Sequence, residues 1–481
     1  MSIKKLLSQE LKIINVGSPS FIDDYDRQNV KYTHLNWSPP AGGNQRLITA
    51  LKYIKTFGEE IKKANQAAVD RIKKAEAVLI DIKPAIEAIP GMTRNTILHA
   101  GPPIKWDNMA GPMRGSILGA MIYEGMAESQ EKAEELIKEG KIIFDSAHNH
   151  SAVGPMAGTI SSSMPVHIIY NRVNDSKAYC TVNEGLGKVL RYGANSKEVI
   201  DRLHWIEKKY MPILKEALLL CGGIDIKNII SQALHMGDEC HNRNKASTAI
   251  FFREIARYIL QTSHTQEEKV DAFDFIRKNE HYFLNLSMPY AKVALDAARG
   301  IKYSTILTVM SRNGVEFGVQ ISNSDRWYTH QANYVEGLMF PGYTKEDAAR
   351  DIGDSAITET AGFGGFAMGG APAIVQFVGG EVESAFNYSK EMHEIASSEH
   401  SVFTLPTLDF MPTAVGIDLI KVIETGILPI INTGIAHKEA GVGQVGAGLV
   451  CPPMMCFEKA LLDFEKTLRT EEKTTKLSLQ Q

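Results

Sequence analysis

Hydrophobic residues recur at helical spacing through most of the middle of the chain, from residue 197 to residue 299. Apolar positions separated by three or four residues predict amphipathic helices at residues 199–220, 227–234, 247–261, 269–277 and 290–298. We therefore expect an all-helical domain over residues 197–299, inserted between two α+β domains.

A small Rossmann-like α/β domain is expected at the beginning of the chain, over residues 1–93. Apolar runs predict strands at residues 11–16, 30–37 and 77–82, and residues 21–28 predict a short helix between the first two. The glycine turn SPPAGG follows the second strand and precedes a helical stretch at residues 45–55. Open α/β sheets bind ligands at such a turn, but it is not a GxGxxG motif, and a purely structural turn is the alternative.

The two α+β domains are expected at residues 94–196 and 300–450. In the first, the pattern predicts helices at residues 112–123 and 130–139 and strands at residues 141–144, 166–171 and 177–182. In the second, alternating apolar residues on both sides of Asn313-Gly314 predict a β-hairpin, and a helix at 418–425 and a strand at 428–432 follow. Residues 451–481 predict a helix at 457–468 and a charged tail that we expect to be disordered.

An internal similarity links these two domains. Residues 129–158 and 343–372 align without a gap, and each is expected to run from a polar helix, containing Ala133 or Ala348, through a short apolar run to a loop of small residues. A duplicated α+β domain is one explanation, and the chance similarity of two helix–loop units is the other.

Composition places the chain among ordinary globular proteins. With 481 residues, 44% hydrophobic and 22% charged, it can bury several cores. The net charge of −4 has both signs interspersed, which argues against nucleic acid or a membrane as a partner. The start has no long apolar run, and five scattered cysteines fit a reducing compartment, so we expect a cytoplasmic protein.

The densest polar stretch lies at residues 232–254, QALHMGDECHNRNKASTAIFFRE, where a polar turn leads into an apolar helix. Asp238 or Asn242 is expected to be the N-cap of this helix. A catalytic or binding site on a rigid helix start is one interpretation, and a capped helix with local ion pairs is the other.

Histidines near this turn and near a second loop, HNHSAVG, supply groups for proton transfer. The catalytic candidates are His148, His150, His235, Glu239 and His241. The His-x-His spacing is also compatible with a metal site, but it is not a metalloenzyme signature, so we expect no resident metal and no cofactor.

Other side chains are suited to holding a small anion. The candidates for substrate binding are Arg114, Lys188, Arg191, Asp238, Asn242, Arg243 and Asn244, because guanidinium and amide groups match carboxylate and phosphate oxygens. Glycine loops at residues 362–370 and 441–448 can direct backbone N–H groups at an anion, and the candidates are Gly154, Gly364, Gly365, Gly369, Gly370, Gly441 and Gly443. Close packing of small residues is the alternative for these loops.

Several phrases along nearly the whole chain together resemble one family. They are INVG, HLNWSPPAGG, HAGPPI, GPMRG, HNHSAVGPMAG, NEGLGKVLRYGA and ALHMGDECHNRN, followed by the glycine loops. The chain resembles the AllG/YlbE-type family, which is encoded beside FdrA-type proteins similar to succinyl-CoA synthetase subunits. The resemblance implies a subunit of an oxamate carbamoyltransferase, which converts oxalurate and phosphate to oxamate and carbamoyl phosphate during allantoin breakdown.

We therefore expect a subunit that binds a small carboxylate and phosphate within a homo- or hetero-oligomer containing an FdrA-type partner. A non-catalytic scaffold or binding subunit of such a complex is the alternative. We also expect the turn 238–244 to face the loop 148–154 across one cleft, since so many polar groups are costly to bury unless they pair or face a solvated pocket.

Overall fold

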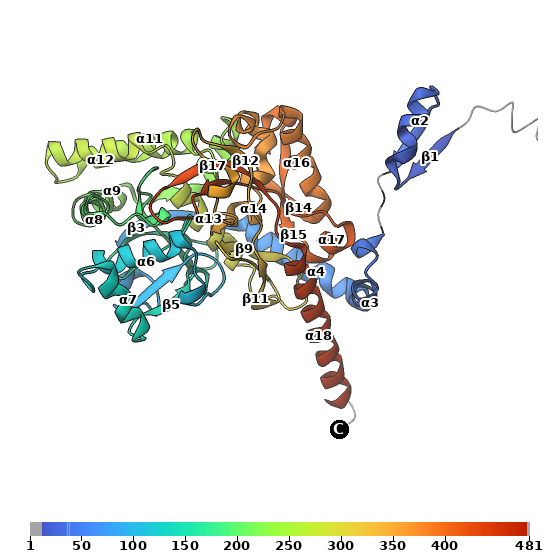
Figure 1. The fold of residues 1–481 in the computed structure, drawn as a ribbon, viewed down its shortest axis with the longest axis horizontal. Helices are drawn as coiled ribbons and strands as arrows, with labels where there is room; N and C mark the ends of the chain where they lie inside the picture. The colour runs from blue at the N-terminus through green and yellow to red at the C-terminus, as the bar shows by residue number, and fades with distance from the viewer. Residues whose placement is uncertain (1–11, 36, 38, 479–481) are drawn as a thin grey trace, which may run out of the picture.

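The computed structural model describes residues 12–478 except Asn36 and Ser38. Strand β1 (Ile13–Val16), helix α2 (Ile22–Arg27) and strand β2 (Tyr32–Leu35) form a β–α–β unit whose two strands pair in parallel. This confirms the predicted pair of strands within the described residues; residue 11, the first position of the strand predicted at 11–16, lies outside them. The unit lies apart from the body of the molecule (Figure 1).

The third strand predicted for this first domain belongs elsewhere. After α3 (Gln45–Ile54) and α4 (Gly58–Lys74), strand β3 (Ala77–Pro84) joins a four-stranded sheet of order β7-β6-β3-β8. Its partners are β6 (Pro165–Asn171) and β8 (Ile224–Asp225), and β7 (Ser176–Thr181) pairs with β6. Every pairing in this sheet is antiparallel, so the assignment of β3 to a Rossmann-like unit was wrong.

The middle of the chain is helical, as the spacing predicts, with one exception. Its helices are α8 (Lys197–Trp205), continued by a π-helical turn, α9 (Met211–Cys221), α10 (Ile226–His235), α11 (Lys245–Gln261), α12 (Gln266–Lys278) and α13 (Leu284–Asp296). The exception is β8, which pairs with β3 and makes the region not all-helical.

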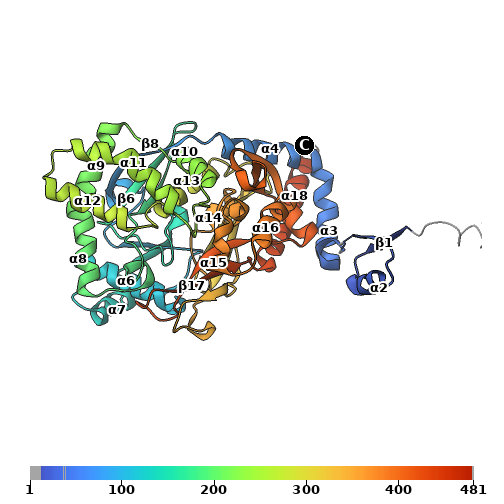
Figure 2. The ribbon, with the colours of Figure 1, turned by 90° about the horizontal axis from the view of Figure 1, so that it is seen from above.

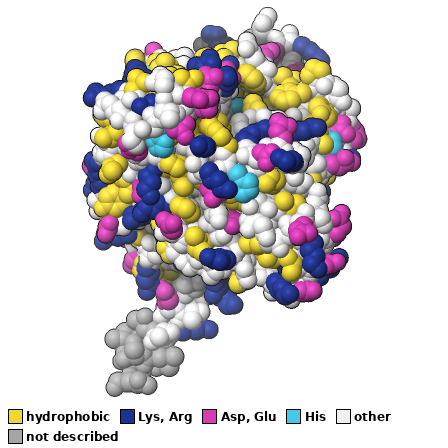
Figure 3. All heavy atoms as spheres, turned by 90° about the vertical axis from the view of Figure 1, so that its left-hand side faces the viewer, with side chains coloured by type: hydrophobic (Ala, Val, Ile, Leu, Met, Phe, Trp, Pro, Cys, Tyr) yellow, Lys and Arg dark blue, Asp and Glu magenta, His cyan; other side chains and the backbone are white. Residues whose placement is uncertain are grey.

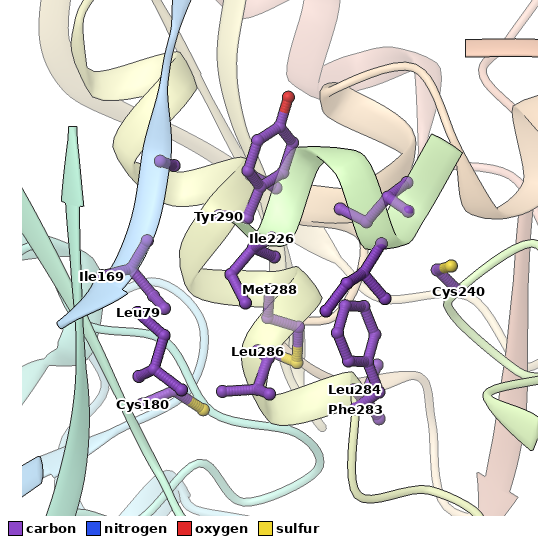
Figure 4. Packing of buried hydrophobic residues seen from close by; sticks show 14 of the residues in the cluster. Leu79, Ile169, Cys180, Ile226, Cys240, Phe283, Leu284, Leu286, Met288 and Tyr290 are labelled. Atoms are coloured by element: carbon purple, nitrogen blue, oxygen red, sulfur yellow. The ribbon is translucent and has the colours of Figure 1, made fainter. Parts of the chain in front are cut away.

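These helices share one core with the four-stranded sheet. Leu79 and Ile169 of the sheet pack in the same buried cluster as Ile226 of α10 and Met288 of α13, as Figure 4 shows. The helical region is therefore built onto the sheet, and apolar burial of this kind is the main source of its stability. Where the limits of the domains lie stays a prediction.

A second β–α–α–β unit covers one end of the molecule. Strands β4 (Thr96–His99) and β5 (Ile143–Ser146) pair in parallel, and α6 (Gly111–Tyr123) and α7 (Gln130–Lys138) connect them. The short helix α5 (Ala85–Ala88) precedes β4. Helices α6 and α7 confirm the two predicted helices, and β5 begins two residues later than the strand predicted at 141–144.

The second half of the chain forms three small sheets. The first has the order β11-β10-β9-β13, the second β12-β17-β16 and the third β14-β15. The strands are β9 (Leu307–Asn313), β10 (Glu316–Ile321), β11 (Ser324–Gln331), β12 (Glu336–Met339), β13 (Ile352–Gly353), β14 (Ala396–Leu405), β15 (Met411–Ile417), β16 (Ile431–Ala436) and β17 (Gln444–Val450). The helices are α14 (Ile357–Thr360), α15 (Val375–Val378), α16 (Val382–Ile395), α17 (Leu419–Thr425) and α18 (Met454–Ser478).

Local turn chemistry is well predicted in this half. Strands β9 and β10 form the expected hairpin, because the Asn313 side chain accepts the backbone N–H groups of Val315 and Glu316 and Gly314 adopts a φ of +83°. The tail was predicted wrongly, since α18 continues to residue 478; residues 479–481 lie outside the description.

The proposed internal duplication is not supported by the backbone. Ala133 lies in α7, whereas Ala348 has extended backbone and forms a β-bridge with His437. Strand β5 pairs in parallel with β4, whereas β13 pairs antiparallel with β9. Two segments related by duplication would share these pairings, so the similarity is confined to the sequence.

Helices α13 and α14 lie near the middle of the molecule in both ribbon views (Figure 1, Figure 2). All of α13 from Leu284 to Leu295 is buried, including the charged residue Lys292, whose ammonium group lies 2.7 Å from the Asp296 carboxylate. The segments around these two helices hold the candidate site. On the face drawn in Figure 3, basic and acidic side chains alternate without a large patch of one sign.

Candidate active site

One pocket collects residues from seven separate parts of the chain. Its wall includes Pro155, Arg191, His241, Asn242, His281 and Thr433. These residues come from loops and element ends, where rigid elements can hold reactive groups toward a shared space. The pocket is the place where the polar turn 238–244 comes near the loop after His148, since Pro155 and Met156 lie on the same wall as His241.

Arg191 is the most unusual side chain of this pocket. It is 8% exposed, its Nη2 donates to the Gly185 carbonyl oxygen at 2.7 Å, and its guanidinium lies 5.4 Å from the centre of the Tyr192 ring. The Nε and Nη1 groups are buried without an acceptor among the described residues. Since a buried N–H without a partner is costly, this guanidinium is arranged to bind an acceptor from outside the chain.

His241 is held by a carboxylate behind it. Its Nδ1 lies 2.7 Å from Glu359 Oε1, and both side chains are almost fully buried. Glu359 also accepts the Gly365 backbone N–H at 2.7 Å and the Thr358 hydroxyl at 2.8 Å. A carboxylate on one ring nitrogen fixes the orientation of the imidazole and stabilises its protonated form, which is the arrangement of a general acid or base.

The polar turn 238–244 is held in place by its own two carboxyl groups, Asp238 and Glu239, which bind backbone N–H groups. Glu239 accepts the N–H groups of Asn242 and Arg243 at 2.6 and 2.9 Å, and burial together with Asp238 raises the pKa of Glu239 to about 8. Asp238 accepts the Ser247 N–H at 2.9 Å and so caps α11 from outside, although Asn244 occupies the N-cap position. The prediction of Asp238 or Asn242 as the N-cap was therefore wrong, because Asn244 occupies that position.

Asn242 and His281 add neutral donors to the pocket wall. The Asn242 Nδ2 group is buried and has no acceptor within the part of the chain that the structure describes. Burial, Arg191 and His241 lower the pKa of His281 to about 3, so its ring is neutral and can bind an anionic ligand without adding charge. Cys240 lies behind the turn, and burial raises the pKa of its thiol well above the usual value, which disfavours a thiolate nucleophile.

His148 lies behind the pocket rather than on its wall. Its Nε2 is 3.1 Å from Asp354 Oδ1, outside hydrogen-bond geometry, and its ring is fully buried. Asp354 also accepts the N–H groups of Gly101 and Gly154 at 2.8 and 2.9 Å and the Ser311 hydroxyl. Burial would raise the pKa of Asp354, but His148 and these donors lower it, so the carboxylate is a charged anchor for the loop 148–154.

The glycine loops are closely packed in this structure. The N–H groups of Gly364, Gly365 and Gly369 donate to Glu239 O, Glu359 Oε1 and Ser389 Oγ, and a Cβ on Gly365 would lie 2.4 Å from the Ile430 carbonyl oxygen. Gly154 and Gly441 donate to Asp354 and to Tyr192 O. These N–H groups are therefore already used within the chain, which favours the packing interpretation over an anion cradle; Gly370 and Gly443 lie in the same loops.

Four predicted residues lie away from the pocket wall. His150 pairs with Asp145 at 2.9 Å, and His235 is exposed with its Nε2 2.8 Å from the Thr404 hydroxyl. Arg114 donates to Asp107 O at 2.6 Å, and Lys188 is exposed. His235 and Lys188 are exposed, whereas His150 and Arg114 are half-buried, and the Arg114 Nε is buried without an acceptor among the described residues.

No sequence feature indicated the two carboxylates that organise the centre. Asp354 and Glu359 lie in DSAITET, a segment without charge clusters or glycines, and only the fold brings them to His148 and His241. Arg312 was also missed; it is fully buried and donates to Asp351 at 2.7 Å and to Gly353 O at 2.9 Å. A lone Arg in an apolar strand is the one available hint, because it must be paired when buried.

Two absences hold for the described part of the chain. It has no group of three or more His, Cys, Asp or Glu side chains placed to hold a metal ion. Between residues 12 and 478, leaving aside 36 and 38, there is also no helix with the length and apolar character needed to cross a membrane.

The fold and the pocket define a class: a mixed α/β multidomain protein with a buried guanidinium and a histidine–carboxylate pair on one pocket. A family model described as oxamate carbamoyltransferase subunit AllG matches residues 142–355. The chain belongs to this AllG family, since it is 43% identical to the oxamate carbamoyltransferase subunit AllG of Escherichia coli K12 over 405 residues, 83% of this chain and 97% of that one.

Two further relatives support the assignment. The uncharacterized protein YahG of Escherichia coli K12 is 47% identical over 462 residues, covering 95% of this chain and 98% of that one. A crystal structure of a conserved protein of unknown function from Enterococcus faecalis V583 is 48% identical with a TM-score of 0.84, covering 85% of this chain and 98% of that one. The fold described above is therefore also similar to a solved structure.

Proposed function

We propose that this chain is the subunit of a carbamoyltransferase-type complex that binds the small carboxylate substrate, together with an FdrA-type partner subunit. The reaction proposed is the one implied for the family, oxalurate and phosphate to oxamate and carbamoyl phosphate, or transfer to a related carboxylate. The observation that carries the proposal is Arg191, whose two free N–H groups lie on the wall of the pocket that also contains His241.

The chemistry requires three groups. A phosphate oxygen attacks the ureido carbonyl carbon, the bond from that carbon to the amide nitrogen of oxamate breaks, and the nitrogen takes up a proton as it leaves. The carboxylate must be held, the developing oxyanion needs a donor, and the departing nitrogen needs an acid.

The pocket offers one residue for each requirement. Arg191 is placed to hold the carboxylate, because its Nε and Nη1 groups are otherwise unpaired. Asn242 Nδ2 is the donor for the carbonyl oxygen, and His241, supported by Glu359, is the acid for the leaving nitrogen. In the reverse direction His241 removes the proton from the amide nitrogen of oxamate.

The alternative is a scaffold or binding subunit without chemistry of its own. The closed glycine loops favour it, since their N–H groups bind the chain and not a phosphate. The two proposals differ in what a change at the pocket does to the reaction of the complex.

The test is Arg191→Lys, with Arg350→Lys as the matched control. Arg350 also lies over an aromatic ring, 4.5 Å from the centre of Tyr334, and donates to a carbonyl oxygen, Ala332 O, at 2.7 Å, but it is not on this pocket. We expect consumption of carbamoyl phosphate by the complex with oxamate to fall in kcat/KM by about 100-fold for Arg191→Lys, as loss of a buried charged contact of about 3 kcal/mol implies. Arg350→Lys should leave the rate unchanged.

The result that overturns the proposal is a complex in which Arg191→Lys turns over carbamoyl phosphate as fast as the unchanged protein. If the complex neither makes nor consumes carbamoyl phosphate with any small amide carboxylate, the scaffold or binding subunit is the alternative that stands.

A further inference from the structure

A second cavity meets the first at Arg191 and Pro155, which lie on the walls of both. Its wall contains Ser116 of α6, Thr159 from the loop before β6, and the segment from Thr181 to Leu190 that follows β7. Helix α8 and the turn after it close the cavity with Leu203 and Ile206. His241 lines only the first of the two cavities.

Three residues of this lining carry hydrogen-bonding groups that the described part of the protein leaves unpaired. The Ser116 hydroxyl, the Thr159 hydroxyl, and the Nε and Nη1 groups of Arg191 are all buried, and no described residue offers any of them a partner. Ser116 is 0% exposed, Thr159 6% and Arg191 8%. A polar group is costly to bury unpaired, and three such side chains on one wall indicate a ligand that pairs with them.

Other residues of the lining are apolar. Val182, Leu190, Leu203 and Ile206 are buried on the same lining and present aliphatic surface to the cavity. A ligand that contacts both kinds of residue has a small anionic group and a short hydrocarbon body.

The charge balance selects a carboxylate over phosphate. Arg191 is the cation on the lining, and the Glu184 carboxylate lies on it as well, where it accepts the Leu190 N–H at 3.1 Å. Burial raises the pKa of the Glu184 carboxyl, and while Glu184 is protonated the lining carries the single positive charge of Arg191, which matches one carboxylate. A phosphate dianion would bring a second negative charge that no cation on the lining balances, and the apolar residues would bind none of its oxygens.

We propose that this second cavity binds the carboxylate end of the substrate, and that the substrate carries a short aliphatic segment next to its carboxylate. The proposal rests on the proposed function, which it deepens by naming a substrate class: aliphatic carboxylates in place of, or beside, oxamate. The carboxylate pairs with Arg191 and the hydroxyls of Ser116 and Thr159, the aliphatic segment lies against Leu203 and Ile206, and the reacting amide points into the pocket of His241.

The experiment is calorimetric titration of the full chain with acetate, butyrate and inorganic phosphate, each as the sodium salt. We expect butyrate to bind about 15-fold more tightly than acetate, because each buried methylene adds about fourfold in affinity. Phosphate should bind more weakly than butyrate. Equal affinities for acetate and butyrate, tighter binding of phosphate, or no binding of any carboxylate would overturn the proposal.

Thr159→Val tests the polar wall without a change in shape. The variant should lose at least about tenfold in butyrate affinity, and its melting temperature should stay the same or rise, because a methyl group replaces an unpaired buried hydroxyl. The matched control is Thr413→Val in β15, since the Thr413 hydroxyl is also buried without a described partner but lies off this cavity. It should change the melting temperature in the same direction and leave butyrate binding unchanged.

Thr159→Ser is the control for a packing effect. It keeps the hydroxyl, so it should keep most of the affinity for butyrate. Loss of affinity in Thr159→Ser equal to that in Thr159→Val, or unchanged affinity in Thr159→Val, would contradict the assignment. Failure of the proposed function gives a different result: butyrate then binds as described, while the complex shows no carbamoyl phosphate chemistry.

Discussion

Replacing Glu359 with Gln removes one buried charge and little else. Glu359 Oε1 accepts from His241 Nδ1 and from the Gly365 N–H, each at 2.7 Å, and the side-chain oxygen of Gln accepts both in the same way. The other carboxylate oxygen accepts the Thr358 hydroxyl at 2.8 Å, and an amide nitrogen there can donate to that hydroxyl instead. The geometry is therefore kept, while the negative charge beside His241 is lost.

The size of the effect follows from this single change. A hydrogen bond to a charged group contributes about 1.5–3 kcal/mol and a neutral one about 0.5–1.5 kcal/mol, so the protonated imidazole loses about 1–1.5 kcal/mol of support. That energy corresponds to about tenfold in rate as a lower bound. The upper bound is the full contribution of a general acid or base, about 10²–10⁴-fold.

The assay is kcat of the complex for carbamoyl phosphate consumption, measured beside the KM for the carboxylate and the melting temperature. We expect kcat to fall by at least about tenfold, KM to change little because Arg191 holds the carboxylate, and the melting temperature to shift by a few degrees at most. The control is Glu465→Gln, since Glu465 is 2% exposed and its carboxylate lies 2.8 Å from Arg469, away from the pocket.

Unchanged kcat in Glu359→Gln would refute the role of the His241–Glu359 pair. An equal loss in Glu465→Gln would refute it as well, because the effect would then come from removing any buried carboxylate.

Two further predictions concern the polar turn. Burial and Asp238 raise the pKa of Glu239 from 4.5 to about 8, so the folded protein keeps a proton that the unfolded chain loses, and its free energy of unfolding should fall as pH rises from about 4.5 to about 8. In urea unfolding across this range, Glu239→Gln should show a weaker dependence of the free energy of unfolding on pH, and an equal dependence would contradict the raised pKa. Arg243 has a buried Nε without an acceptor among the described residues, so Arg243→Lys should lower kcat/KM by about tenfold or more at an unchanged melting temperature, whereas a lower melting temperature with a matching loss of activity would mean a structural role.

Local patterns predicted the elements that local physics decides. The hairpin at Asn313 followed from its turn residues, and the helical middle followed from its spacing. Sheet membership did not follow. Strand β3 has the apolar character of any buried strand, and its antiparallel partners β6 and β8 lie more than 80 and 140 residues away in the chain, a distance over which spacing carries no information.

The same distinction between local pattern and distant partners applies to the residues of the candidate site. His241 and Asn242 were identified because their polar neighbours are contiguous in the sequence, and Arg191 because glycines flank its segment. Glu359 and Asp354 could not be, since each binds partners far along the chain. Thr159 could not be either, because only the fold shows that its hydroxyl is buried without a partner on a cavity wall.

The same comparison explains why the glycines misled. A glycine is selected both where a backbone N–H must face a ligand and where another chain segment leaves no room for a Cβ, and the sequence is identical in the two cases. Only the acceptor of the N–H separates them. Gly365 donates to Glu359, so it helps to orient the carboxylate that binds His241. Unpaired donors on a pocket wall are the better sign of a ligand site, and Arg191, Thr159 and Asn242 have such donors, whereas the N–H groups of Gly364, Gly365 and Gly369 are paired.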